Sequence, residues 1–179
     1  VDGGFVRLPS GRTAVGIAGG FRHTCAMLDN GAMSCWGEGT AGKLGYGNTG
    51  NAFDIGDNEL IGDNPVNGGL VRLPGPDDVV EIGTGYSHSC ALLANGRVTC
   101  WGYGGDGELG TGSIATIGDN ETAAQQVVNG GYVRLPGNQR VVHLAVGGFH
   151  TCALMVSGEI TCWGYGGDGA LGYGNTSSI

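Results

Sequence analysis

One cysteine-containing stretch is written three times in this chain, and that repetition constrains the fold more than any other feature. The copies recur about every 60 residues, a period typical of proteins in which each structural unit covers the apolar face of its neighbour. Each copy holds two cysteines on either side of a turn and ends in Cys-Trp-Gly. The three copies are HTCAMLDNGAMSCWG at His23–Gly37, HSCALLANGRVTCWG at His88–Gly102 and HTCALMVSGEITCWG at His150–Gly164.

Two further elements keep a constant distance from this stretch in every copy. A short apolar run (AVGIAGG, VVEIGTG or VVHLAVG) comes just before the histidine, and a Gly-Gly-x-Val-Arg-Leu-Pro segment opens each repeat. The elements are short, rich in β-branched residues and bounded by Gly, Pro or Asn, which predicts an all-β protein with about four strands per repeat. The opening segments are Gly3–Pro9, Gly68–Pro74 and Gly130–Pro136, and the predicted repeats cover residues 1–65, 66–127 and 128–179.

Composition removes several classes of function. Glycine accounts for 40 of the 179 residues, but the glycines recur at fixed places, which indicates turns rather than low-complexity disorder. The 16 acidic and 8 basic residues give a net charge of −8, which opposes binding to nucleic acid. No apolar run approaches about 18 residues, so membrane insertion is not expected. The chain starts at Val1 without a signal peptide, and we expect it to be mature or cut from something larger.

The cysteines of each copy are placed symmetrically about a turn. If Leu28 closes a three-residue hairpin loop against Ala32, counting outward pairs Cys25 with Cys35. Residues directly opposite on antiparallel strands are close enough for a disulfide, so the spacing favours disulfides over free buried thiols or a metal site. Local pairing of an even cysteine count indicates an oxidising compartment: extracellular, cell-surface or periplasmic. The same count predicts Cys90–Cys100 and Cys152–Cys162.

The combined pattern resembles the regulator of chromosome condensation (RCC1) repeat. It reads V-x-[IL]-x-x-G-x-x-H-[TS]-C-A, then C-W-G, and then the GKLGYGN, GELGTG and GALGYGN segments. The resemblance implies a β-propeller built of four-stranded antiparallel blades, usually seven, in proteins that act mainly as binding scaffolds. The paired cysteines and long acidic insertions resemble bacterial cell-surface versions of the repeat. The repeats here are longer than usual. The binding residues of the family's exchange factors lie in loops that cannot be matched in this chain, so exchange activity is not implied.

The resemblance also implies where the blades begin. The Val-Arg-Leu-Pro strand is expected to be the outermost strand of the preceding blade, which leaves the first such strand without a blade of its own. Three blades are too few to close a ring. The chain is therefore expected to be a piece of a longer array, or to join other copies head to tail through this assembly strand. The assembly strand consists of Phe5, Val6, Arg7, Leu8 and Pro9.

Several recurring residues invite functional interpretations that we weigh against structural ones. His23, His88 and His150 suggest a metal triad, but equivalent positions in successive blades are too far apart, and a role in fixing a bend through backbone hydrogen bonds is favoured. The tryptophans after each second cysteine are expected to pack between blades rather than stack on a ligand. The arginines of the opening segments are expected on a solvated face. These sets are Trp36, Trp101 and Trp163, and Arg7, Arg72 and Arg134.

Two acidic loops, Asp54–Glu59 and Thr116–Glu121, carry hard oxygen ligands that calcium prefers. Neither loop fits an EF-hand or the RTX nonapeptide, and a turn built by Asp and Asn side chains is favoured over calcium binding. Asn120 and Asn175 match the N-glycosylation pattern. The candidate calcium ligands are Asp57, Asn58, Glu59, Asp119, Asn120 and Glu121.

No catalytic motif is present, and His143, the one histidine outside the repeat, has no evident partner in the sequence. We therefore expect a non-enzymatic module that needs no cofactor, with calcium as the one candidate. Its expected partners are other copies of itself, further repeats, or an unidentified protein or glycan. The alternatives are a calcium-dependent or glycan-binding adhesin and a protein inhibitor of an enzyme.

Overall fold

The computed structural model describes residues 4–47, 54–56, 61, 67–126 and 128–179. This part of the chain is all β apart from short 3₁₀ turns, and its strands form three antiparallel three-stranded sheets with orders β1-β2-β3, β4-β5-β6 and β7-β8-β9. The strands are β1 (Ala14–Gly19), β2 (His23–Leu28), β3 (Met33–Gly37), β4 (Val79–Thr84), β5 (His88–Leu93), β6 (Val98–Gly102), β7 (Val141–Val146), β8 (His150–Met155) and β9 (Ile160–Gly164). The 3₁₀ turns are η1 (Pro9–Gly11), η2 (Thr40–Gly42), η4 (Asn67–Gly69), η5 (Ala123–Gln125), η6 (Val128–Gly131), η7 (Pro136–Asn138) and η8 (Gly167–Gly169).

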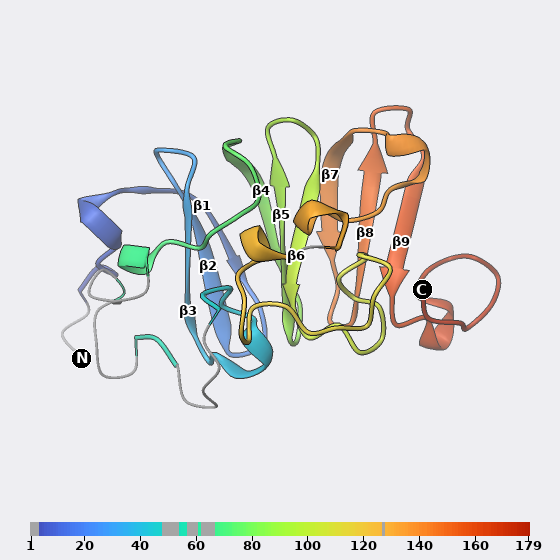
Figure 1. The fold of residues 1–179 in the computed structure, drawn as a ribbon, viewed down its shortest axis with the longest axis horizontal. Coiled ribbons are helices and arrows are strands. Elements are labelled where there is room, and N and C mark those ends of the chain that lie inside the picture. Colours follow the sequence, from blue (N-terminus) through green and yellow to red (C-terminus); the bar gives the residue numbers. More distant parts are fainter. Residues whose placement is uncertain (1–3, 48–53, 57–60, 62–66, 127) are drawn as a thin grey trace.

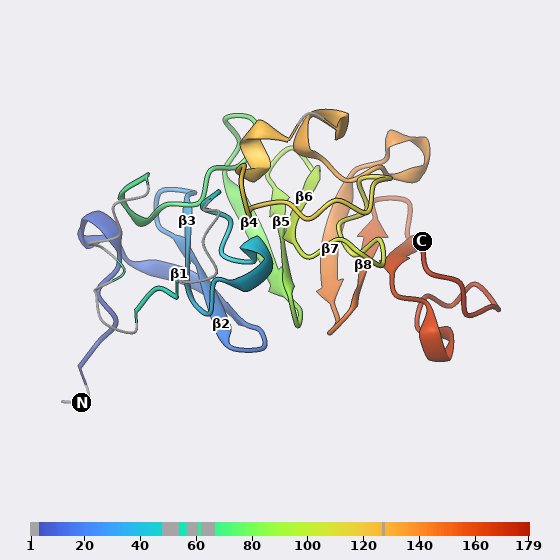
Figure 2. The same ribbon diagram turned by 60° about the horizontal axis from the view of Figure 1, so that its bottom comes forward.

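The three sheets stand side by side along the long axis of the molecule, in chain order (Figure 1). The first described residues, which lead into η1, and the C-terminus lie toward opposite ends of this row, as the turned view also shows (Figure 2). The turns that join the second and third strand of each sheet all lie at the top of Figure 1. Loops that join the first and second strands therefore share the opposite end, so the same sequence position in each repeat reaches the same face.

The hairpin turns set the strand register as the sequence predicts. Leu28 N donates to Ala32 O at 2.8 Å, and Gly31 occupies the left-handed region at φ 78° that closes such a loop. The β2–β3 register then places Cys25 opposite Cys35, and the same pairing recurs in the other two sheets.

The sheets have three strands each, so the prediction of four-stranded blades is wrong in detail. The predicted fourth segment lies against the preceding sheet, as expected, but makes too few ladder bonds to form a strand. Val71 N donates to Met33 O at 3.0 Å, and Val133 N donates to Val98 O at 2.8 Å. The next donor, Arg134 N, bonds to Gly110 O in a loop, and the proline that follows has no N–H. We call residues 69–74 and 131–136 the outer segments of the first and second sheets.

The core lies within and between the sheets. Trp101 and Leu109 are fully buried, and partly buried residues on the inner strands of later sheets, such as Ile82 and Leu144, pack against the same cluster. Ile17, at the corresponding position of the first sheet, is 71% exposed because no described sheet precedes it. Each sheet therefore depends on its neighbour for burial, as expected of a repeat array.

Candidate functional site

Each hairpin carries its own disulfide. The bonds join Cys25 to Cys35, Cys90 to Cys100 and Cys152 to Cys162, which are the pairs that the turn symmetry predicts. No cysteine in the described residues is free, which leaves no thiolate for catalysis or metal binding there. Such bonds persist in oxidising surroundings.

The repeated histidines join neighbouring sheets instead of converging on a metal. His23 Nε2 lies 2.9 Å from Ser89 Oγ, and His88 Nε2 lies 3.0 Å from Thr151 Oγ1. His23 Nδ1 also lies 3.3 Å from the carbonyl oxygen of Phe21, the backbone contact that the sequence predicts. Burial lowers the pKa of His23 and lowers that of His88 to about 4, so both rings are neutral at neutral pH.

The tryptophans pack between sheets, as predicted. Trp101 Nε1 donates to Lys43 O at 3.0 Å, and Trp163 Nε1 donates to Glu108 O at 2.8 Å, each reaching back to the loop of the preceding repeat. Trp36 is only partly buried, because no described repeat lies before it. The predicted solvated arginines, Arg7, Arg72 and Arg134, are exposed.

The expectation that His143 lacks a partner is wrong. Its Nδ1 lies 2.9 Å from Glu81 Oε1, and the other carboxylate oxygen of Glu81 accepts a hydrogen bond from Leu144 N. The pair connects β4 to β7 across two repeats, a contact that no local sequence pattern could reveal. His143 remains exposed, so this pair stabilises the fold little.

The second acidic loop is described, whereas Asp57, Asn58 and Glu59 of the first lie outside the described residues. Burial and the neighbouring Asp119 carboxylate raise the pKa of Glu121, whose Oε2 atom has no hydrogen-bond partner in the described part of the chain. The described residues contain no group of three or more His, Cys, Asp and Glu side chains placed to hold a metal ion. Asn120 and Asn175 are exposed, as a glycan acceptor must be.

One surface feature was missed in the sequence. Phe21, Tyr86, Phe149 and Tyr165 form a continuous row across the three sheets, at the end opposite the hairpin turns. Ring centroids are 4.2 Å apart for Phe21 and Tyr86, 5.2 Å for Tyr86 and Phe149, and 6.4 Å for Phe149 and Tyr165. Each ring is 42 to 48% exposed. We call these four residues the aromatic row. An aromatic residue precedes the histidine in every repeat, which was the available signal, but its position shifts by one in the third repeat.

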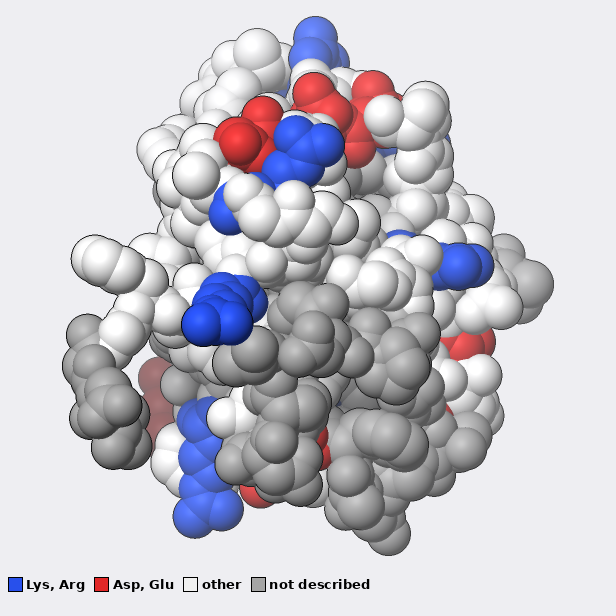
Figure 3. All heavy atoms as spheres, turned by 90° about the vertical axis from the view of Figure 1, so that its left-hand side faces the viewer, with Lys and Arg blue, Asp and Glu red and all other residues white. Residues whose placement is uncertain are grey.

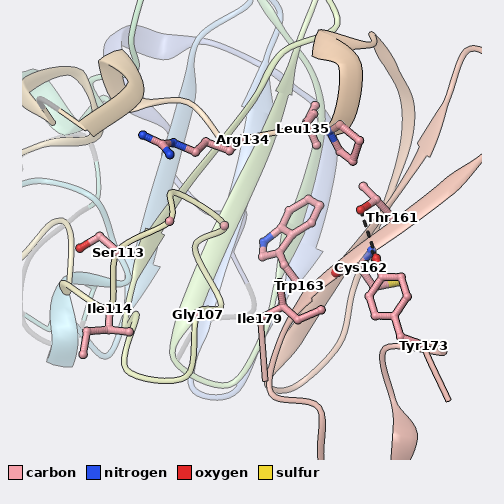
Figure 4. Close-up of a pocket in the computed structure, with 13 residues that line it drawn as sticks. Gly107, Ser113, Ile114, Arg134, Leu135, Thr161, Cys162, Trp163, Tyr173 and Ile179 are labelled. Atoms are coloured by element: carbon pink, nitrogen blue, oxygen red, sulfur yellow. Dashed lines mark hydrogen bonds between the residues drawn. The ribbon is translucent and has the colours of Figure 1, made fainter. Parts of the chain in front are cut away.

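A second open feature lies on the outer side of the third sheet. A cavity of about 910 Å³ is bounded by β9, the outer segment of the second sheet and the loops around Gly110 and Tyr173. Figure 4 shows Arg134 and Leu135 on one side of this space and Thr161, Trp163 and Tyr173 on the other.

The face formed by the first sheet shows acidic and basic side chains interspersed, with no large patch of one sign among its described residues (Figure 3).

The family model described as the regulator of chromosome condensation (RCC1) repeat matches residues 14–43, 79–108 and 141–170. Each match covers the three strands of one sheet and the loop that follows.

The chain belongs to the RCC1 repeat family.

Curated relatives include the ultraviolet-B receptor UVR8 of Arabidopsis thaliana, 28% identical over 160 residues that cover 89% of this chain and 31% of UVR8. The mitochondrial RCC1 domain-containing protein RUG3 of the same plant is 31% identical over 161 residues, with the same coverage. The chain matches only 3% of the human E3 ubiquitin-protein ligase HERC2. It spans about a third of UVR8 and RUG3, so it corresponds to part of these proteins.

Solved structures show the same fold. Yeast RCC1 (Prp20), in a structure with Kap60, superposes with a TM-score of 0.63 at 24% identity, covering 93% of this chain and 35% of that one. Human WBSCR16 gives a TM-score of 0.62 at 20% identity, covering 87% and 34%. The sheets are therefore blades of an RCC1-type β-propeller.

No helix in the described part of the chain has the length and hydrophobicity needed to cross a bilayer. The repeat boundaries at 65/66 and 127/128, and the bacterial cell-surface subtype, stay predictions.

Proposed function

We propose that this chain is a non-enzymatic recognition module that works outside the cell and binds a protein partner through the aromatic row. RCC1-like repeats are consistent with such a binding role, and the relative in the Kap60 structure is seen with a protein partner. The three disulfides support an extracellular location. Association between copies of the chain is a second part of this proposal.

The single observation that carries the proposal is the exposure of four aromatic residues across three blades, three of them stacked and the fourth, Tyr165, in edge-on contact with Phe149. Exposed aromatic residues are the side chains that most often anchor protein interfaces, because they bury much area at low entropic cost. Phe21 and Tyr86 are stacked with an interplanar angle of 10°, so each covers one face of the other. Tyr86 is stacked on Phe149 as well, with centroids 5.2 Å apart. Stacked rings can enter a groove on a protein, whereas a sugar would need an open ring face.

The test compares capture of partners by the immobilised chain and by a triple variant, Phe21→Ser with Tyr86→Ser and Phe149→Ser. The matched control replaces Val15, Val80 and Val142 by Ser, which are 65, 50 and 48% exposed and also lie one per blade. We expect a protein from the host's extracellular fraction to be retained by the native chain and the control but lost from the row variant. Equal capture by all three, or capture only of glycans on an array, would refute binding of a protein by the row. Capture of an enzyme whose activity then falls would support the inhibitor alternative.

We also propose calcium as a ligand of the 116–121 loop, on the ground that Glu121 Oε2 is buried without a partner beside Asp119. Ion binding to the folded chain alone raises its melting temperature by mass action. Millimolar calcium should raise the melting temperature of the native chain and not that of Glu121→Gln, with magnesium as the control ion. An unchanged melting temperature would leave only the turn interpretation.

A further inference from the structure

We propose that the second and third blades bind an arginine-rich segment of the protein partner, at the end of the molecule that carries the aromatic row. This inference rests on the proposed function and names the chemistry of the partner. An exposed ring and an exposed carboxylate recur together in both blades, and the loops around them carry no cation. The first blade fills the corresponding place with an arginine of its own.

A tyrosine and an aspartate recur together just after the third strand of these two blades. Tyr103 and Tyr165 are 43 and 46% exposed, and each begins a Tyr-Gly-Gly-Asp-Gly segment. Each ring lies over its own loop, since a Cβ added to Gly105 would clash with Tyr103 and one added to Gly167 would clash with Tyr165. Each blade therefore presents a ring and a carboxylate from the same short loop. The exposed aspartates are Asp106 and Asp168.

Backbone hydrogen bonds place these tyrosines beside the aromatic row. Tyr103 N donates to Ser87 O at 2.8 Å, directly after Tyr86, and Tyr165 N donates to Phe149 O at 2.9 Å. Tyr86 is stacked on two neighbours, whereas Tyr165 makes an edge contact and Tyr103 contacts no ring in the described part of the chain. Tyr103 and Tyr165 are thus the rings on which a planar guanidinium can stack.

The first blade shows which kind of group this end accepts. Arg22 places its guanidinium over the ring of Phe21, 5.2 Å from the centroid. The same guanidinium lies 3.5 Å from a carboxylate oxygen of Glu38, which takes the position of Tyr103 and Tyr165 in the repeat. A guanidinium held by a ring and a carboxylate is therefore already present at this end, supplied by the chain itself.

The loops of the second and third blades supply no such cation. Ser87 and Phe149 take the position of Arg22 in the repeat. Glu108 takes that of Lys43, whose buried ammonium is paired with a carboxylate of the first blade. The row end of these blades therefore has carboxylates in place of both cations. The arginines beyond residue 67 lie in the outer segments or beside the hairpin turns, and they are Arg72, Arg134, Arg97 and Arg140.

Glu108 adds a buried carboxyl at the boundary between these blades. It is 1% exposed, and its Oε2 atom accepts a hydrogen bond from Asp106 N at 2.9 Å. Burial raises the pKa of this carboxyl, and the nearby Asp106 carboxylate raises it further. A Cβ added to Gly164 would lie 2.6 Å from Phe149 O and 3.3 Å from Glu108 Cα, so Glu108 lies against the loop that carries Phe149. A cation bound here would offset the repulsion between the two carboxylates.

Arginine fits this combination of groups better than lysine does. A guanidinium is planar, so it can stack on a ring while it donates two parallel hydrogen bonds to a carboxylate. The ammonium of lysine is a point charge that gains only the electrostatic part. The net charge of −8 also attracts a basic segment from a distance.

The test measures binding of short fluorescent peptides by anisotropy. The peptides alternate serine with arginine, with lysine or with glutamate. We expect the native chain to bind the arginine peptide, to bind the lysine peptide more weakly and not to bind the glutamate peptide. Raising the salt concentration from about 0.05 M to about 0.5 M should weaken binding, because the carboxylates involved are exposed.

Two pairs of substitutions separate the row end from the net charge. Asp106→Asn with Asp168→Asn should weaken binding of the arginine peptide roughly three- to tenfold. The matched control is Asp29→Asn with Glu159→Gln, which removes two exposed carboxylates from the hairpin turns at the opposite end and should leave affinity unchanged.

A third variant tests the rings. Tyr103→Leu with Tyr165→Leu keeps apolar side chains but removes the rings, and it should abolish the preference for arginine over lysine. No binding of the arginine peptide, equal effects of the two carboxylate pairs, or a preference for arginine that survives the leucine substitutions would each overturn the proposal.

Capture of the natural partner distinguishes this inference from the proposed function. A partner lost from the aromatic-row variant but retained by Asp106→Asn with Asp168→Asn would leave the proposed function standing and overturn the inference of a basic segment. A partner lost from both variants, and released by the arginine peptide, would support both. A partner retained by the aromatic-row variant would refute the proposed function itself.

Discussion

The Nε2 atom of His88 lies 3.0 Å from Thr151 Oγ1, and this buried hydrogen bond joins residues 63 apart in the chain, in two different blades. Together with the bond from His23 to Ser89, it means that every described boundary between blades is crossed by a neutral imidazole. Stability of the array therefore depends on the protonation state of these rings.

We expect stability to fall as the pH is lowered from about 6.5 toward 4. The pKa of His88 is about 4 in the folded chain and near 6.5 when unfolded, so the unfolded state binds more protons between these values. Stability from the neutral ring is fully present above pH 6.5 and is lost as the pH falls, by roughly 3 kcal/mol at most for His88. Urea unfolding from pH 8 to 4 measures this. His88→Gln keeps a donor without the titration and should flatten the curve; parallel curves for both proteins would contradict the assignment.

Thr151→Val should destabilise the chain by about 1–3 kcal/mol. The substitution keeps the side-chain shape but leaves His88 Nε2 buried without a partner. Thr24→Val is the matched control, because Thr24 holds the same position in the first blade and its hydroxyl has no hydrogen bond within the described residues. The difference between the two free energies of unfolding, measured in dilute protein, checks the prediction. Equal losses would mean that the inter-blade bond contributes nothing.

Removing one disulfide should lower the free energy of unfolding by about 2–3 kcal/mol in the chain-entropy model, since each bond closes a short loop between cysteines ten residues apart. Cys90→Ala with Cys100→Ala is the variant, compared with the native chain by urea unfolding. Peptide mapping without reductant should recover only the three pairs within hairpins. Pairs between repeats, or an unchanged midpoint, would count against this role.

Gly110→Ala should be much more damaging than Gly172→Ala, although the two glycines hold the same place in the G-x-L-G segment. Both have positive φ, 60° and 78°, so each alanine costs roughly 1 kcal/mol of backbone strain. A Cβ on Gly110 would also lie 2.8 Å from Trp163 Nε1 and from Val133 Cγ1, whereas one on Gly172 would meet no atom within 4 Å. Thermal melts should separate the variants by a further 1–3 kcal/mol. Equal melting temperatures would show that the boundary is not closely packed at Gly110.

The sequence by itself determined what lies within one repeat. The register that places Cys25 opposite Cys35 follows from a turn only a few residues away, and a local turn leaves little choice of pairing. The position of the outer segment on the preceding sheet was implied by the resemblance to the RCC1 repeat, whereas its failure to form a full strand was not predicted. The donor of Arg134 turns to a loop carbonyl of the preceding connection, whose course the sequence pattern does not specify.

Only the tertiary structure decided what crosses between repeats. The contacts of His88 with Thr151, of Glu81 with His143 and of Trp163 with Glu108 join residues more than fifty apart. The stacking of Phe21 on Tyr86 is of the same kind. Such contacts depend on how two finished sheets pack, and packing angle and depth are set by side-chain volumes over the whole boundary rather than by any local pattern. The exposed aromatic row belongs to this level, which is why the repeats could be found from the sequence and this candidate binding surface could not.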